Sequence, residues 1–198
     1  AVIATGSNNS ARYFETYFKK YPHIIRRNRN GAGVLTGTET PQDLHLLGQD
    51  VFRFFGLGCR NVAKVYVPQD YDFNPLLEAF HEYRELVLHA KYKHNFDYNY
   101  ALLILNKVQH HANGCILLTE NASLTSRIGT LHYAYYTDIP QLLEELGQQE
   151  EEIQCVVAQP GLLPIPTLTF GQTQEPNLWD YPDGVDTLAF LIQLTTLN

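Results

Sequence analysis

Methionine is absent from the 198 residues of this chain, and its three cysteines, Cys59, Cys115 and Cys155, form no CxxC pair. An odd, widely spaced set of cysteines argues against both a disulfide framework and a zinc site. No apolar run is long enough to span a membrane, and no secretory signal peptide is visible. These absences predict a protein of a reducing compartment, and we expect it to be cytoplasmic.

Basic residues are also scarce. The 14 lysines and arginines face 21 aspartates and glutamates, which leaves a net charge of −7. Since no basic stripe compensates locally, a nucleic-acid partner is not expected. The most basic stretch is Arg-Arg-Asn-Arg at residues 26–29, which fits either a solvated turn or a contact for a phosphate-bearing small molecule.

Several histidines raise the question of a metal, but their spacing does not favour one. None forms an HxxxH pair with a carboxylate in the position that a zinc enzyme needs. We therefore interpret them as solvated or core residues and expect no metal. The histidines concerned are His81, His89, His94, His110 and His111.

Short apolar stretches alternate with longer stretches whose apolar residues recur at helical spacing. Strands are predicted at residues 2–5, 34–36, 62–67, 115–118, 128–136 and 153–158. Helices are predicted at residues 11–20, 41–55, 76–93, 139–146 and 186–194, and residues 26–33 are predicted to form a polar turn. The alternation predicts an α/β fold with a largely parallel sheet flanked by helices. No internal repeat and no linker dividing two domains is visible.

Two short segments carry candidate chemistry. Gly6 and Ser7 follow the first strand and precede a helix, where free N–H groups and the helix dipole favour an anion, although simple helix capping has the same appearance. Cys59 lies in a turn flanked by Gly58, between a helical and a strand pattern, where backbone N–H groups could stabilise a thiolate or an oxyanion. An unreactive cysteine filling a turn is the alternative. Cys115 and Cys155 lie inside predicted strands and are expected in the core.

The order of these segments resembles the aldehyde dehydrogenase superfamily. In that superfamily a strand ends in Thr-Gly-Ser and enters a helix, as residues 5–7 do here, and a later helix leaves through a Gly-x-x-Cys turn into a strand, as residues 56–59 do. Residues 126–131, Ser-Arg-Ile-Gly-Thr-Leu, resemble the superfamily's Glu-x-Phe-Gly-Pro-Val segment. The similarity is greater to the acyl-CoA reductase family, the fatty acid reductase type of bacterial luminescence, through residues 21–26, 178–187 and above all FGLGCRN at residues 55–61.

The resemblance implies a reaction and its site residues. Cys59 would attack an acyl-CoA, or another acyl thioester such as an acyl-protein, and NADPH would reduce the resulting thioacyl-enzyme to an aldehyde. Gly6, Ser7 and Ser126 would contact the cofactor, and the Cys59 backbone N–H would contribute to the oxyanion hole. A homodimer is a further expectation of the family.

The departures from the superfamily pattern are also informative. Residues 26–31 carry no carboxylate where hydrolytic members have a water-activating glutamate, so water attack on the intermediate should be slow. Ser126 replaces a cofactor-contacting glutamate. The superfamily's dinucleotide-binding half lies upstream of Ala1, so we expect residues 1–198 to be the cysteine-bearing catalytic domain and C-terminal segment of a longer reductase. The alternatives are a CoA-acylating aldehyde dehydrogenase running oxidatively, and a truncated, non-catalytic domain that binds a partner or a nucleotide.

Overall fold

The computed structural model describes residues 1–195 and divides the chain into two compact units. Unit 1 contains residues 1–29 together with the segment from Pro176 onward, and unit 2 contains residues 30–175. The first boundary falls between Arg29 and Asn30, and the two glycines that follow it, Gly31 and Gly33, belong to a strand and not to a linker. None of the helices among the described residues is long and apolar enough to cross a membrane.

Unit 1 is built on one β-α-β segment. β1 (Val2–Thr5) and β2 (His23–Arg26) pair in parallel, with Thr5 opposite Arg26, and α1 (Asn8–Phe18) connects them. Within the same unit, η3 (Pro182–Gly184) precedes α6 (Thr187–Thr195), and the Arg26 guanidinium donates to Thr187 Oγ1 at 2.9 Å. The strand predicted at residues 2–5 is confirmed, as is the last helix, and the first helix begins three residues earlier than predicted.

Unit 2 contains a six-stranded sheet in the order β5-β6-β7-β4-β3-β8. Its strands are β3 (Asn30–Val34), β4 (Val62–Pro68), β5 (His110–Ala112), β6 (Leu117–Glu120), β7 (Thr130–Tyr136) and β8 (Ile153–Val157). Every neighbouring pair is parallel except β5 and β6. The predicted α/β fold with a largely parallel sheet is therefore confirmed.

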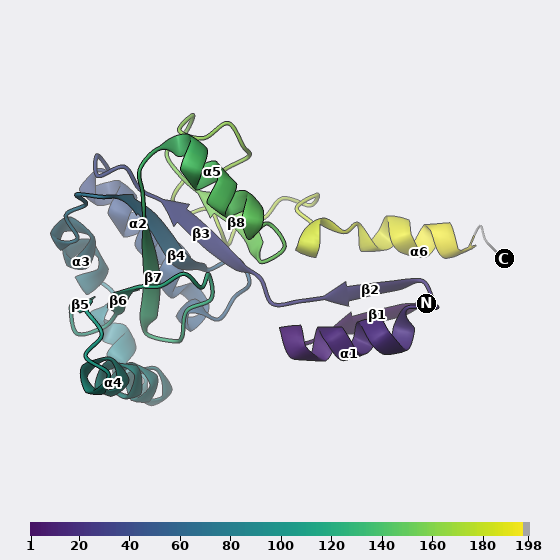
Figure 1. Ribbon diagram of the computed structural model, residues 1–198, viewed down its shortest axis with the longest axis horizontal. Helices are drawn as coiled ribbons and strands as arrows, with labels where there is room; N and C mark the ends of the chain where they lie inside the picture. The colour runs from purple at the N-terminus through teal and green to yellow at the C-terminus, as the bar shows by residue number, and fades with distance from the viewer. Residues whose placement is uncertain (196–198) are drawn as a thin grey trace. The chain divides into compact units, whose positions relative to one another are not determined.

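Helices cover both faces of this sheet (Figure 1). α2 (Pro41–Phe52) and α3 (Asn74–His81) bury Leu47 and Phe80 against Val65 on one face. α5 (Ile139–Gln148) buries Leu142 against Tyr66 on the other. Because successive residues of a strand point to opposite faces, β4 supplies both cores and is buried along nearly its whole length.

The polar turn predicted for residues 26–33 is wrong. Residue 26 ends β2, and β3 begins at Asn30 and pairs with β4 on one side and β8 on the other. Its Asn-Gly-Ala-Gly sequence has low strand propensity, so only this pairing at long range makes it a strand. Gly31 is needed there, because a Cβ would lie 2.8 Å from the carbonyl oxygen of Arg60.

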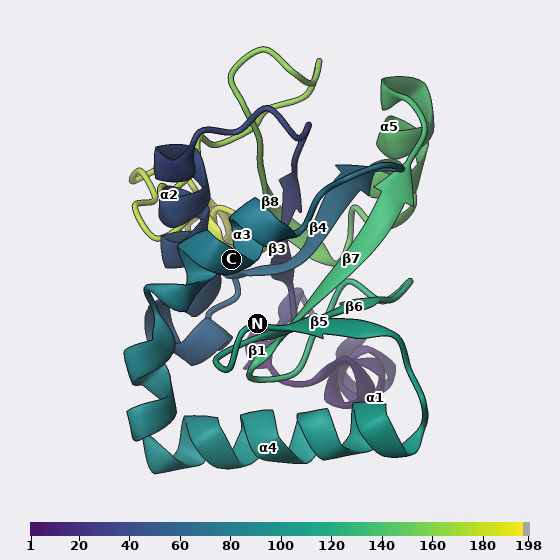
Figure 2. The same cartoon turned by 90° about the vertical axis from the view of Figure 1, so that its left-hand side faces the viewer.

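The single helix predicted at residues 76–93 is also wrong. The chain forms α3, then η2 (Arg84–Leu88), and turns at the extended residue His89 into α4 (Ala90–Leu105). α4 lies beside the β5 edge of the sheet (Figure 2), where Tyr100 and His110 meet edge to face at 5.4 Å. β5 was not predicted, because a three-residue edge strand leaves almost no pattern.

Replacing Gly48 by alanine is expected to lower the free energy of unfolding by about 1–3 kcal/mol. A Cβ at Gly48 would lie 2.3 Å from Cε2 of Tyr83, whose hydroxyl donates to the His45 carbonyl at 2.8 Å and whose ring stacks on Phe52. Urea denaturation measures the change. Gly147→Ala in α5 is the matched control, because a Cβ there meets nothing within 4 Å and should be neutral or stabilising. Equal stabilities of the two variants would contradict the close contact between α2 and Tyr83.

Candidate active site

Cys59 occupies the corner of a tight turn that leads directly into β4. The N–H of Asn61 donates to the carbonyl of Gly58 at 3.0 Å, which closes a four-residue turn with Cys59 at its second position. The Cys59 side chain is exposed. Its backbone N–H donates to no atom of the described residues. The turn therefore presents a thiol and a free amide donor side by side.

Asn61 holds this turn to the end of the preceding helix. The side chain is 1% exposed, and its Oδ1 accepts the N–H of Gly58 at 2.8 Å. Its Nδ2 donates to the carbonyls of Asp50 and Arg53 at 2.8 and 2.9 Å. Carbonyls at a helix C-terminus lack partners within the helix, so one buried amide both caps the helix and fixes the cysteine turn. Asn61 is the last residue of the FGLGCRN segment, but the sequence alone did not predict this role for it.

The chain reverses sharply between α2 and the turn. Phe54 and Phe55 have φ values of 54° and 59°, and Gly56 follows at 74°. The helix predicted at residues 41–55 is wrong at its end, since α2 ends at Phe52 and η1 (Arg53–Gly56) follows. Left-handed phenylalanines cost about 1–3 kcal/mol each. Packing of the Phe55 ring against His89, with centroids 4.7 Å apart, helps to offset this cost.

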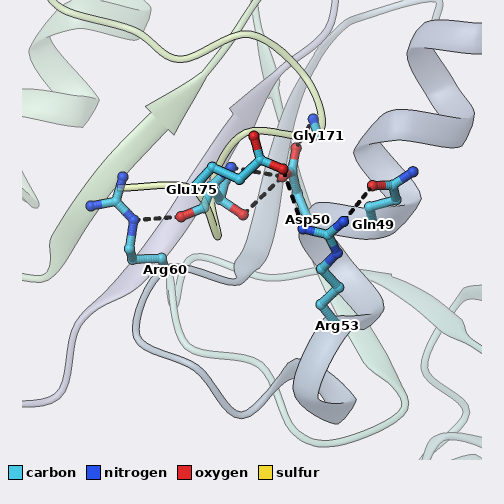
Figure 3. Close-up of polar contacts among 7 residues, drawn as sticks. Gln49, Asp50, Arg53, Arg60, Gly171 and Glu175 are labelled. Atoms are coloured by element: carbon cyan, nitrogen blue, oxygen red, sulfur yellow. Dashed lines mark hydrogen bonds and ion pairs between the residues drawn. The ribbon is translucent and has the colours of Figure 1, made fainter. Parts of the chain in front are cut away.

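A distant segment, loop 171–175, is fixed beside this turn by Asp50 (Figure 3). Asp50 is 1% exposed; its Oδ2 accepts the Gly171 N–H at 2.7 Å, and its Oδ1 accepts the N–H and hydroxyl of Thr173 at 3.0 and 2.8 Å. Burial raises the pKa of this carboxyl group, although the three hydrogen bonds act in the opposite direction. No local sequence pattern indicates this contact, because its partners are more than 120 residues apart.

Two arginines add further contacts to loop 171–175. Arg60, next to the cysteine, donates its Nε to the carbonyl of Thr173, and Figure 3 shows its guanidinium pointing toward that loop. Arg53 forms an ion pair with Glu175 at 3.9 Å. Loop 171–175 is therefore tied both to the end of α2 and to the cysteine turn itself.

The segment containing Ser126 lies close to the element that delivers Cys59. α4 holds this segment: Asn99 donates to the Ile128 carbonyl at 3.0 Å, and Gly129, at φ 76°, leaves 3.2 Å between its Cβ position and Phe96. Residues 126–130 and residues 55–56 line one cavity of about 20 Å³. Ser126 is thus brought beside the residues that precede the cysteine, whereas Cys59 is not part of the lining. The cavity holds about one water molecule, too little for a nicotinamide ring.

Gly6 and Ser7 belong to unit 1, at the amino end of α1. Ser7 is the N-cap, its Oγ accepting the N–H of Ser10 at 3.2 Å, while the first-turn N–H groups of Asn8 and Asn9 have no acceptor among the described residues. These free amides fit a phosphate group.

The other two cysteines differ from Cys59 in burial. Cys115 is fully buried, and burial raises the pKa of its thiol to about 11, as expected for a core residue. Cys155, predicted in the core, is only half-buried on β8, where its Sγ lies 3.7 Å from the Arg60 carbonyl. Among the residues that the structure describes, no group of three or more metal-binding side chains is placed to hold a metal ion.

The fold and the cysteine turn together define a class of protein: an α/β domain with an exposed thiol in the turn that connects a helix to a central parallel strand. No family model and no curated protein matches the sequence. Among solved structures, the chain is similar to an aldehyde dehydrogenase from Bacillus cereus determined as its NAD+ complex, with a TM-score of 0.57 and 9% identity over 80% of this chain and 39% of that one. It is similar to lactaldehyde dehydrogenase from Escherichia coli with a TM-score of 0.55 and 10% identity, over 80% of this chain and 40% of that one. It is also similar to proline utilization A from Bradyrhizobium japonicum, with a TM-score of 0.54 and 18% identity, over 80% of this chain and 20% of that one.

These similarities show that the chain has an aldehyde dehydrogenase-like α/β fold, as the sequence predicted. The chain spans between 20% and 40% of the length of the three relatives.

Proposed function

We propose that this chain carries the nucleophile of an acyl-thioester reductase that converts an acyl-CoA to the aldehyde. The observation that carries the proposal is the Cys59 turn: an exposed thiol next to a free backbone N–H, fixed by a buried asparagine. The Cys59 thiol loses its proton and its sulfur forms a bond to the acyl carbon, the bond from that carbon to the CoA sulfur breaks, and CoA leaves as its thiol after taking up a proton in exchange. The Cys59 N–H donates to the acyl oxygen while negative charge develops on it.

The entry to β3 supports reduction over hydrolysis. A Cβ at Gly31 would lie 2.8 and 3.1 Å from the carbonyl oxygens of Arg60 and Asn61, so no side chain fits there beside the cysteine turn. The preceding residue is Asn30, whose Oδ1 accepts a hydrogen bond from Thr125 at 3.0 Å. No carboxylate in this segment can act as a base toward water, which favours a thioacyl intermediate that survives until it is reduced.

NADPH would supply the hydride for that reduction. The amino end of α1, with Gly6 and Ser7, would hold its phosphates, because the free N–H groups there fit an anion. Ser126 would contact its ribose through a hydroxyl. β1 and β2 pair only with each other among the described residues, and a two-stranded sheet is marginally stable alone. This observation, together with the greater length of the relatives, supports an upstream dinucleotide-binding half in the complete protein.

The 198-residue chain by itself is therefore expected to bind NADPH with a Kd of about 1 mM or weaker, which corresponds to less than about 4 kcal/mol of binding free energy. The first turn of α1 has free N–H groups that fit a phosphate, and the proposal places the remaining contacts to the dinucleotide in the upstream half. Titration followed by NADPH fluorescence measures the affinity. Micromolar or tighter binding by this chain would contradict the proposal that the main cofactor-binding half lies upstream.

The proposed function is tested by intact-protein mass after incubation with dodecanoyl-CoA. A single adduct of one acyl group, removed by hydroxylamine, is expected on Cys59. Oxidation of aldehydes in the presence of CoA passes through the same thioacyl group, so the direction of the reaction is a separate measurement of rates both ways. A chain that never becomes acylated, even with an upstream half restored, would instead indicate a non-catalytic binding domain.

A further inference from the structure

Phe54 has two unfavourable features that the fold does not offset. Its backbone is left-handed, at φ 54°, a conformation that glycine, asparagine and aspartate adopt more readily than phenylalanine. Its side chain is 66% exposed, belongs to neither hydrophobic core, and meets no other ring among the described residues. Phe55 has the same backbone conformation, but its ring packs against His89 and Tyr92, with centroids 4.7 and 6.3 Å apart. Strain without compensating packing indicates a function for the Phe54 side chain.

Leu57 is a second exposed apolar side chain on the same segment. It is 67% exposed, and its N–H donates to the Phe54 carbonyl at 3.1 Å, so the chain turns back and holds the two residues close together. Between Leu57 and the exposed Cys59 thiol there is only Gly58, which has no side chain. Phe54 and Leu57 are therefore the exposed apolar side chains that lie nearest to Cys59 in the chain.

The charged side chains of this segment are engaged elsewhere. Arg53 forms an ion pair with Glu175, and Arg60 donates to the Thr173 carbonyl, so loop 171–175 holds both guanidinium groups. A single exposed leucine is ordinary on a protein surface and needs no explanation. Two exposed apolar side chains beside an exposed thiol, one of them on a strained backbone, form a surface from which water is readily displaced by hydrocarbon.

We propose that Phe54 and Leu57 bind the hydrocarbon chain of the acyl group that Cys59 accepts, and that they determine a preference for long-chain over short-chain thioesters. This inference rests on the proposed thioacyl chemistry of Cys59. The acyl carbon becomes bonded to the Cys59 sulfur, so the chain attached to it lies over residues close to the cysteine turn. Contact with the two side chains removes apolar surface of the chain and of the protein from water, which favours a dodecanoyl group over an acetyl group.

A phenylalanine that serves the substrate and one that serves the fold predict opposite effects on stability. Phe54→Asn places a residue that tolerates left-handed backbone at an exposed position, so the thermal midpoint should equal or exceed that of the wild type. Phe55→Asn is the matched control, because it changes the same residue type at the same backbone conformation and removes a ring that packs against His89. Its thermal midpoint should fall, and an equal fall in Phe54→Asn would show that the Phe54 ring serves the fold.

The binding test compares acylation of Cys59 by dodecanoyl-CoA and by acetyl-CoA, each followed by intact mass. Phe54→Asn and Leu57→Asn are each expected to lower the ratio of the dodecanoyl rate to the acetyl rate about 10-fold below the wild-type ratio. Leu105→Asn is the matched control, because Leu105 is 77% exposed at the end of α4, and the substitution should leave the ratio unchanged.

N-octylmaleimide and N-methylmaleimide test the same surface without acyl transfer, because both reagents alkylate an exposed thiol. The Cys155→Ala background restricts the reaction to Cys59, since Cys115 is buried. Relative to the two rates with glutathione, Cys59 should prefer the octyl reagent about 10-fold, and Phe54→Asn and Leu57→Asn should lower this preference. The same rates are measured with an upstream half restored, where the preference should persist.

The outcomes separate this proposal from the proposed function. A wild-type ratio of the two acylation rates in both variants would overturn the role of Phe54 and Leu57 and leave the proposed function standing, as would an equal fall of both rates. Loss of the octyl preference when an upstream half is restored would also overturn it, because that half would then cover the two side chains. An octyl preference without an adduct from either acyl-CoA would overturn the proposed function, and with it the acyl chain as the ligand of this surface.

Discussion

Cys59→Ala is expected to reduce acyl transfer from dodecanoyl-CoA to background, at least about 10³-fold below the wild type. Alanine leaves the backbone N–H of residue 59 and the turn around it in place and removes the atom that bonds to the acyl carbon. Gly58 and Asn61 close the turn through backbone atoms, so the fold should not depend on the thiol. Intact mass and release of free CoA measure the loss, and the thermal midpoint should be unchanged.

Cys155→Ala is the matched control for this prediction. Its thiol is half-buried on β8 and lies near the same turn, 3.7 Å from the Arg60 carbonyl, so it is the strongest competitor for an acyl group. We expect the Cys155→Ala variant to be acylated as fast as the wild type. An adduct that persists in Cys59→Ala and disappears in Cys155→Ala would show that the nucleophile had been assigned to the wrong cysteine.

The sequence predicted the elements whose signal is local. The strand that follows Cys59 is a run of buried residues between a turn and a proline, and α2 begins with a Thr40–Asp43 capping box and Pro41. β3 has neither signal. Its glycines are in a sheet because β4 and β8 pair with both edges, and such pairing is set by residues far away in the sequence.

The residues of the candidate site likewise divide into those predicted from local motifs and those that depend on contacts between distant parts of the chain. Cys59 and the segment of Ser126 were predicted from motifs, and the structure brings the Ser126 segment to the residues that precede the cysteine. The contribution of Asp50 was missed. It depends on a contact between α2 and loop 171–175, and a single sequence records no such pairing.

Asp50→Ala is expected to lower the free energy of unfolding by about 3–5 kcal/mol, which is among the largest effects of any single change in this chain. The substitution leaves three buried donors, the Gly171 N–H and the N–H and hydroxyl of Thr173, without their acceptor. Urea denaturation at neutral pH measures the loss. Asp70→Ala, at an exposed aspartate on the surface of the same unit, should change stability by less than about 0.5 kcal/mol.

Asp50→Asn is expected to lose less stability than Asp50→Ala, because an amide oxygen still accepts from Thr173 while its NH₂ opposes the N–H of Gly171. It also tests the sign of the pH dependence. Since burial raises the pKa of Asp50, its contribution is full below the unfolded pKa of about 3.9 and is lost as the pH rises through the raised value. The stability of the wild type relative to Asp50→Asn should therefore decline from about pH 4 upward, and a rise would contradict the raised pKa.

The Asp50→Ala variant also distinguishes a residue that supports loop 171–175 from one that takes part in the reaction. Without Asp50, loop 171–175 loses its main attachment to α2, so Asp50→Ala should lose acylation rate as well as stability, whereas Cys59→Ala should lose acylation alone. Both changes can be measured on the same two variants under the same conditions. If Asp50→Ala lost less than about 1 kcal/mol, the buried carboxylate would not be what holds loop 171–175 against α2.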